Sequence, residues 1–360
     1  MLKKAAALLL VGVSAATWTS CGNTVSNYLY AAIPAASEIA VFREDPNSGL
    51  LTELSTGPVS AGPGVHALAV APSGKFLYAA NAGEGDISTY SVTEGYLTEI
   101  GSRTLLAQNA EPTLLVMDST GSYLYAADAV ASAIYSFSID ASSGALSPVT
   151  GSPFPVGVSP LAMQIPSSGN VLYVTGQSGT FGYVQAFSLS SGKLVQPPLP
   201  NSPYLTGTNP VGLTISSNGS YLYTANAAPD NSISQFTINP DGSLNTNPTI
   251  IGSGTLSSPS ALLITKVGNF LFAADDVSSG SLVAFSVNSS GGLTLVASGQ
   301  YGTAAYPDVV ATDPKGDFVF VGNQSTPKIQ SFQLNNGNSN LITVGAYPIP
   351  GTPTSIVILK

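Results

Sequence analysis

The sequence of 360 residues contains seven copies of one short segment. Most copies have an aromatic or Val residue, Leu and Tyr, followed by small residues: 27–33 (NYLYAAI), 75–81 (KFLYAAN), 122–128 (SYLYAAD), 170–176 (NVLYVTG), 220–226 (SYLYTAN), 269–275 (NFLFAAD) and 317–323 (DFVFVGN). Their starts are 48, 47, 48, 50, 49 and 48 residues apart. A period of this length with several short strands per copy is typical of a β-propeller, in which each repeat forms one four-stranded blade.

Each copy is followed by a second apolar strand that is centred on an aromatic residue. These aromatics recur at nearly the same spacing: Phe42, Tyr90, Phe137, Phe187, Phe236, Phe285 and Phe332. A turn of Asp, Asn, Ser and Gly comes next, for example 140–144 (DASSG), and residues of these types favour hairpin turns. A short fourth strand and a small aliphatic strand, such as 112–117, complete the unit. The recurring tyrosines, including Tyr30 and Tyr78, are therefore interpreted as blade packing rather than as a sugar-binding stripe.

The two ends of the repeat array complement each other. The first copy has no aliphatic strand before it, whereas the last aliphatic strand, 353–360 (PTSIVILK), has no copy after it. We therefore predict an all-β fold, a closed seven-bladed β-propeller whose C-terminal strand pairs with 27–33. Closure would leave no unpaired sheet edge, and an open solenoid is the alternative.

The N-terminus has the pattern of an export signal. Lys3 and Lys4 precede an apolar run, 5–16, which is too short to span a bilayer, and small and polar residues follow up to Cys21. We predict a signal peptide over 1–21 with a lipobox-like end, a short linker over 22–26 and one propeller domain over 27–360. Cys21 is the only cysteine, and its position predicts lipidation, although Trp18 stands where a lipobox usually has Leu. The alternative is a plain secretory peptide with an incidental cysteine.

The charge balance limits the possible partners. Removing the leader takes Lys3 and Lys4 from the 10 basic residues and none of the 19 acidic ones, so the net charge falls from −9 to −11. An acidic chain is repelled by nucleic acids and by anionic membrane surfaces. We expect no nucleic-acid partner and membrane contact only through a lipid on Cys21. We expect a monomer in the periplasm, or at the outer membrane or cell surface, whose partner is a small molecule or an envelope protein.

The repeats resemble a known family. The pattern of LYAAN-like segments, an aromatic third strand, SSG-like turns and Pro-initiated aliphatic strands is similar to the seven-bladed lactonase family, whose best-known activity is that of a 6-phosphogluconolactonase. It is also similar to surface-protein propellers with Tyr-Val-Thr-Asn repeats. The resemblance covers 27–360 and implies a hydrolytic site in the central funnel, with Arg and His at the start of inner strands, often as Pro-Arg-His.

This chain lacks the basic residues of that pattern, which a phosphosugar would need for binding. It has no Pro-Arg-His, and its one histidine stands in Val65-His66-Ala67. Arg43 and Arg103 are its only arginines. The turns that carry Lys75, Lys266 and Lys315 are expected on the face opposite the funnel. A phosphate group needs fixed cations, which are scarce here.

Alignment of the inner-strand starts predicts a ring of residues at the lip of the central channel. Its members are His66, Thr113, Leu161, Val211, Ser260, Asp308 and Thr354; beside them, before the prolines, stand Glu111, Ser159, Asn209, Ser258, Tyr306 and Thr352. His66 and Asp308, with Arg103 nearby, are the catalytic candidates, because a His–carboxylate pair can activate a water. The ligand-binding candidates are Glu111, Thr113, Asn209, Ser260, Tyr306 and Thr354. The alternative is a solvated histidine and an unrelated aspartate.

Five further acids fall in or near the loops expected on the funnel face: Asp86, Asp128, Asp230, Asp275 and Asp276. Calcium takes several such oxygens, but no calcium-loop spacing is present, and ordinary loop solvation is the alternative. We predict no metal site and no cofactor, with calcium as the alternative.

Two functions follow from these observations. The first is a propeller of the cell envelope that binds a ligand or a protein. The second is a lactonase-type hydrolase that opens a sugar lactone with His66, Asp308 and Arg103.

Overall fold

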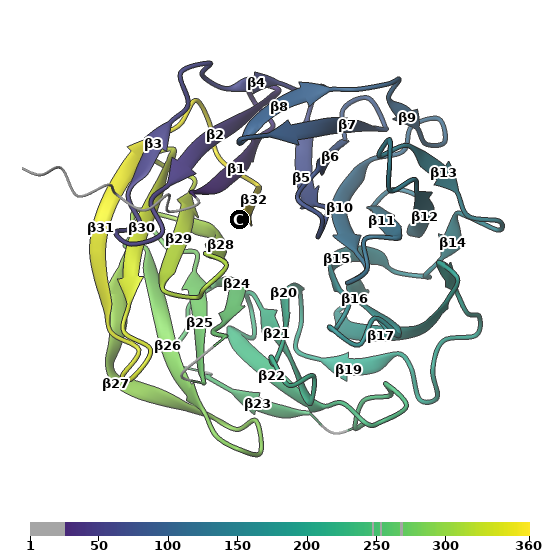
Figure 1. Ribbon diagram of the computed structural model, residues 1–360. Coiled ribbons are helices and arrows are strands. Elements are labelled where there is room, and N and C mark those ends of the chain that lie inside the picture. Colours follow the sequence, from purple (N-terminus) through teal and green to yellow (C-terminus); the bar gives the residue numbers. More distant parts are fainter. Residues whose placement is uncertain (1–25, 247, 253, 267–268) are drawn as a thin grey trace, which may run out of the picture.

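The computed structural model describes residues 26–246, 248–252, 254–266 and 269–360, and the described chain forms a ring of seven blades around a central opening (Figure 1). The predicted signal peptide and Cys21 lie outside the described residues. Within the described part of the chain, no helix is long and apolar enough to cross a membrane.

The strands occupy four concentric positions in each blade. The inner strands, from blade 1 to blade 7, are β32 (Ser355–Leu359), β5 (Val65–Val70), β10 (Pro112–Met117), β15 (Ser159–Gln164), β20 (Pro210–Ile215), β24 (Pro259–Ile264) and β28 (Pro307–Thr312). The second strands are β1 (Asn27–Ile33), β6 (Phe76–Asn81), β11 (Tyr123–Asp128), β16 (Val171–Ser178), β21 (Tyr221–Asn226), β25 (Phe270–Asp275) and β29 (Phe318–Asn323).

The third strands are β2 (Glu38–Glu44), β7 (Asp86–Thr93), β12 (Ala133–Ile139), β17 (Phe181–Ser190), β22 (Ser232–Thr237), β26 (Ser281–Val287) and β30 (Lys328–Leu334). The outer strands are β3 (Leu51–Glu53), β8 (Tyr96–Glu99), β13 (Leu146–Pro148), β18 (Lys193–Leu194), β23 (Thr249–Ile251), β27 (Leu293–Gly302) and β31 (Leu341–Pro348). Blades 1 to 4 each add a short strand that pairs with the third strand: β4 (Val59–Ser60), β9 (Thr104–Leu105), β14 (Phe154–Pro155) and β19 (Tyr204–Thr206).

One residue pair recurs in every blade. The aliphatic residue of the second strand lies directly opposite the aromatic residue of the third: Leu29 and Phe42, Leu77 and Tyr90, Leu124 and Phe137, Leu172 and Phe187, Leu222 and Phe236, Leu271 and Phe285, Val319 and Phe332. All of these side chains are buried. Because side chains alternate between the two faces of a strand, Leu29 packs against blade 7 and Tyr30 against blade 2. The core therefore consists of seven layers between neighbouring blades.

The predicted closure is confirmed. Strand β32 pairs antiparallel with β1, with Tyr28 opposite Leu359 and Ala32 opposite Ser355. The first blade is thus built from both ends of the described chain (Figure 1).

Candidate functional site

The inner strands of blades 2 to 7 share an irregularity at their first residues. The register skips one residue directly after the pair formed by the proline, or by Val65 in β5, as between Val65 and Ala67. The skipped residues are His66, Thr113, Leu161, Val211, Ser260 and Asp308. Such a β-bulge leaves one residue outside the regular ladder and changes the direction of its side chain. In blade 1 the corresponding Thr354 directly precedes β32.

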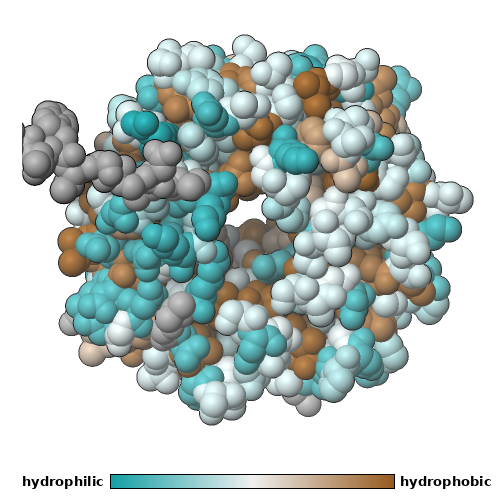
Figure 2. Space-filling view, in the orientation of Figure 1, coloured by the Kyte–Doolittle hydropathy of each residue, from teal (hydrophilic) through white to brown (hydrophobic). Residues whose placement is uncertain are grey.

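These residues surround a cavity of about 490 Å³ at the centre of the ring. All seven blades contribute to its wall, which includes Thr354, His66, Leu114, Leu161, Val211, Ser260 and Asp308. Figure 2 shows the central opening, with both hydrophilic and hydrophobic residues at its edge. The volume lies in the range of ordinary small-molecule sites.

Side chains of the ring bind the backbone of the next blade. The Thr354 hydroxyl donates to the His66 carbonyl (2.7 Å), and His66 Nδ1 lies 2.9 Å from the Thr113 carbonyl oxygen. The Ser260 hydroxyl donates to the carbonyl of Pro307 (2.8 Å). These bonds link blades 1, 2 and 3, and blades 6 and 7, at the wall of the cavity.

The contact with Thr113 determines the protonation pattern of the His66 ring. A carbonyl oxygen only accepts hydrogen bonds, so Nδ1 must carry the proton and donate it. Nε2 is then the nitrogen that accepts or releases a proton, and no described residue bonds to it. Because His66 lies on the cavity wall, it presents a base to whatever occupies the cavity.

Two carboxyl groups share the cavity with His66. Burial raises the pKa of Asp308, and a hydrogen bond with Gln324 and the charge of His66 oppose this. Burial also raises the pKa of Asp276, and the negative charges of Asp308 and Asp275 raise it further. Asp276 Oδ1 is enclosed without a hydrogen-bond partner. Both groups therefore hold their protons more tightly than solvated carboxyls do.

The structure places five of the predicted site residues on the cavity wall: His66, Asn209, Ser260, Asp308 and Thr354. Thr113 takes part through its carbonyl group, which holds His66.

Three predicted site residues are absent from this wall: Arg103, Glu111 and Tyr306. Arg103 forms ion pairs with Glu84 (2.5 Å) and Glu99 (2.8 Å) beside the outer part of blade 2. These acids hold the guanidinium there, so Arg103 is not a partner of His66. Glu111 is exposed, and its backbone N–H donates to Asp128 (3.2 Å). Tyr306 is 38% exposed and does not line the cavity.

Most of the loop acids order the backbone. Asp128 Oδ1 accepts from the N–H groups of Glu111, Val130 and Ala131, and Asp275 Oδ1 accepts from those of Ser257 and Ser258. Among the described residues, no three His, Cys, Asp or Glu side chains are grouped so that they could hold a metal ion.

Asp276 lies on the cavity wall but is missing from the site residues predicted from the sequence, where it was grouped with the other loop acids of the funnel face. In blades 2 to 7 the repeated segment ends in Asn, Asp or Gly, and the following residue is Ala82, Ala129, Gln177, Ala227, Asp276 or Gln324. Asp276 is the one acid at this position. That contrast was visible in the sequence and could have identified it.

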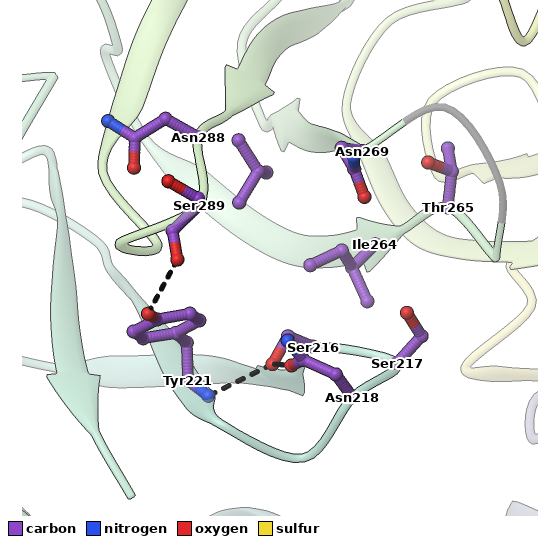
Figure 3. A pocket seen from close by; sticks show the side chains of 10 residues that line it. Ser216, Ser217, Asn218, Tyr221, Ile264, Thr265, Asn269, Asn288 and Ser289 are labelled. Carbon is purple, nitrogen blue, oxygen red and sulfur yellow. Dashed lines mark hydrogen bonds between the residues drawn. The ribbon is translucent and has the colours of Figure 1, made fainter.

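A second cavity, of about 280 Å³, lies between blades 5 and 6 (Figure 3). It is bordered by turns at the opposite ends of the inner strands. Its polar groups serve those turns: the Tyr221 hydroxyl donates to the Ser289 carbonyl (2.9 Å), and the Tyr221 N–H donates to the Ser216 hydroxyl (2.9 Å). Asn288 Oδ1 accepts from the N–H groups of Ser290 and Gly292. The central cavity, where Asp276 and His66 retain unbonded atoms, is the stronger candidate.

Comparison with known proteins agrees with this architecture. The family model described as "Lactonase, 7-bladed beta-propeller" matches residues 23–159, 150–255 and 246–358. The chain belongs to this lactonase family. A search of curated proteins gives no significant match.

Solved structures with the same fold include two bacterial relatives. A provisionally assigned 6-phosphogluconolactonase from Bacteroides fragilis has a TM-score of 0.78 and 18% identity, covering 94% of this chain and 99% of its own. The periplasmic gluconolactonase of Pseudomonas aeruginosa has a TM-score of 0.74 and 20% identity, covering 93% of this chain and 99% of its own. At these identities the likeness shows the fold alone. The cavity of this family member has no Lys or Arg among its lining residues.

Proposed function

We propose that this lactonase-family propeller is an exported protein of the cell envelope that binds a small, phosphate-free molecule in its central cavity. The observation that carries the proposal is the composition of the cavity wall. It combines two carboxyls, an imidazole, an amide and hydroxyls with apolar side chains, and it includes no Lys or Arg. Polar groups of this kind suit a hydroxylated ligand, whereas a phosphate needs fixed cations.

Isothermal titration of the chain with monosaccharides and their phosphates tests the ligand class. We expect neutral or cationic saccharides to bind and their 6-phosphates not to bind. Tight binding of a sugar phosphate would contradict the proposal, whatever the effect of Asp308→Asn on it. The cavity wall has no Lys or Arg that could hold the phosphate.

Export and lipidation form a separate part of the proposal. It rests on the Lys3–Lys4 pair, the apolar run 5–16 and Cys21 directly after them. Cell fractionation with mass spectrometry of the mature N-terminus checks it. We expect a lipid mass on Cys21 and a membrane-bound protein, and release into the soluble periplasm in Cys21→Ser. A cytoplasmic protein with residues 1–21 intact would overturn this part.

Hydrolysis of an unphosphorylated sugar lactone is the second candidate function. His66 favours it, because its Nδ1–H is bonded to Thr113 and Nε2 is left as a base toward the cavity. In such a reaction, Nε2 would take a proton from a water whose oxygen attacks the lactone carbonyl. The ring C–O bond would then break, and the released alkoxide would take up the proton.

A lactone panel with and without a chelator separates the two candidates. Turnover would have to fall at least about 100-fold in His66→Ala, the usual scale of general-base catalysis, while the fold is retained. A chelator is expected to leave the rate unchanged. Saccharide binding with no lactone turnover would favour the binding function.

A further inference from the structure

The central cavity contains acidic side chains without matching cations. Asp276 and Asp308 lie on its wall, and His66 is the one other titratable side chain there. No Lys or Arg lies on this wall. Arg103 is paired with Glu84 and Glu99, and Lys266 Nζ donates to the carbonyl oxygen of Pro314 (2.8 Å). Apart from the charge of His66, which acts on Asp308, no basic side chain of the cavity wall neutralises the two carboxyls.

Asp276 and Asp308 come from neighbouring blades and act on each other. Asp276 follows β25, and its N–H donates to the Ser258 carbonyl (2.8 Å), which holds its backbone beside the start of β24. Asp308 is the bulge residue of β28. The negative charge of Asp308 disfavours ionisation of Asp276, and Asp276 Oδ1 has no donor. A cation between the two groups would offset the repulsion between the two carboxylates, and its N–H groups could donate to Asp276 Oδ1.

The surroundings favour an ammonium group on a hydroxylated molecule. Among the described residues, no three His, Cys, Asp or Glu side chains are grouped so that they could hold a metal ion. An ammonium group needs only hydrogen-bond acceptors for its three N–H bonds. Ser258, Ser260 and Asn209 stand on the same wall and can bind hydroxyl groups. Leu161 and Val211 offer apolar surface to the C–H faces of a sugar ring.

We propose that the cavity takes a positively charged, hydroxyl-rich ligand of the amino-sugar class, with its ammonium group between Asp276 and Asp308. This inference rests on the proposed function of the cavity as a ligand-binding site. It adds the charge of the ligand and the two side chains that recognise it.

Isothermal titration at pH 7 and low salt with D-glucosamine, N-acetyl-D-glucosamine and D-glucose tests it. The acetylated sugar has a neutral amide with an added acetyl group in place of the ammonium, and glucose has a hydroxyl there. We expect glucosamine to bind about tenfold more tightly than the two neutral sugars, and the preference to fall to about one in Asp276→Asn and in Asp308→Asn. Glu53→Gln, which removes an exposed carboxylate of β3, should keep the preference.

The other outcomes are distinct. Equal binding of all three sugars, or a preference that persists in both Asn variants, overturns the inference and leaves the proposed binding function standing. No binding of any saccharide overturns both. Circular dichroism and thermal unfolding of each variant show whether a loss reflects unfolding, and glucose binding retained in the Asn variants shows that the cavity is intact.

Discussion

Glu44 is a buried acid that does not line the central cavity, and its surroundings make it sensitive to pH. Its side chain is fully buried at the end of β2, where Asn27 Nδ2 donates to Oε2 (2.7 Å) and Oε1 has no partner. Burial raises the pKa of Glu44 to about 7, and the charges of Asp313 and Asp45 add to this, against the hydrogen bond from Asn27.

We expect the free energy of unfolding to fall as the pH rises through the window between the ordinary pKa of 4.5 and about 7. In this window the folded state keeps the proton on Glu44 and the unfolded chain has released it, so folding is favoured at the acidic end. Glu44→Gln should remove up to about 3 kcal/mol of this pH dependence, because each pKa unit corresponds to about 1.4 kcal/mol. Urea denaturation at pH 5, 6, 7 and 8 measures it.

The matched control is Glu53→Gln, which changes an exposed carboxyl on the neighbouring strand β3. It should leave the pH dependence of the wild type in place. Identical slopes for wild type and Glu44→Gln would show that Glu44 does not carry the effect.

At the scale of elements, the turn between the third and outer strands connects several blades to the one before. In blade 3, the Gly144 carbonyl accepts from the Tyr78 hydroxyl of blade 2 (2.9 Å). The same bond joins Tyr173 to Gly242 and Tyr223 to Gly291, both at 2.7 Å. These three tyrosines are fully buried and bonded between blades, so they form no sugar-binding stripe.

Gly144→Ala should destabilise the protein for two reasons. The residue has φ +74°, which disfavours any side chain, and a Cβ atom there would lie 2.6 Å from Cδ1 of Phe76. We expect a loss of about 2–4 kcal/mol in urea denaturation, the sum of backbone strain and overpacking. Gly101→Ala has a similar φ of +68° but no atom within 4 Å, so it should lose only about 1 kcal/mol. Equal losses in the two variants would contradict the packing argument.

The β-bulge at the start of the inner strands is the element that makes the site. The recurring spacing of the repeats could align His66, Ser260 and Asp308 as equivalent residues. It could not show that each is skipped by the ladder, because a bulge depends on how the strand meets its partner and the next blade.

At the scale of the whole molecule, closure depends on the last residues of the chain. In β32, Ile356 and Ile358 pack between blades 1 and 7, and Val357 and Leu359 pack between blades 1 and 2. The Thr354 hydroxyl adds a bond to the His66 carbonyl of blade 2 (2.7 Å).

Deletion of 353–360 should prevent folding. It removes four aliphatic side chains that each contribute roughly 1.5–3 kcal/mol, and the sum is comparable to the stability of a domain. It also exposes the edge of β1. We expect aggregation or loss of the soluble protein, measured by the soluble fraction and by size-exclusion chromatography. Deletion of Lys360 alone should have little effect. A soluble, fully stable protein without 353–360 would show that closure of blade 1 is dispensable.

The sequence by itself determined the number of blades, their strand order and the closure by β32, because seven copies of one period-2 pattern have a matching deficit at the two ends. Only the tertiary structure decided the composition of the cavity. Ion pairs with Glu84 and Glu99 hold Arg103 within blade 2, and the packing of blades 6 and 7 brings Asp276 and Asp308 to one cavity wall. The pattern within one repeat records the contacts that every blade shares. The site depends on contacts between particular blades, which no single repeat contains.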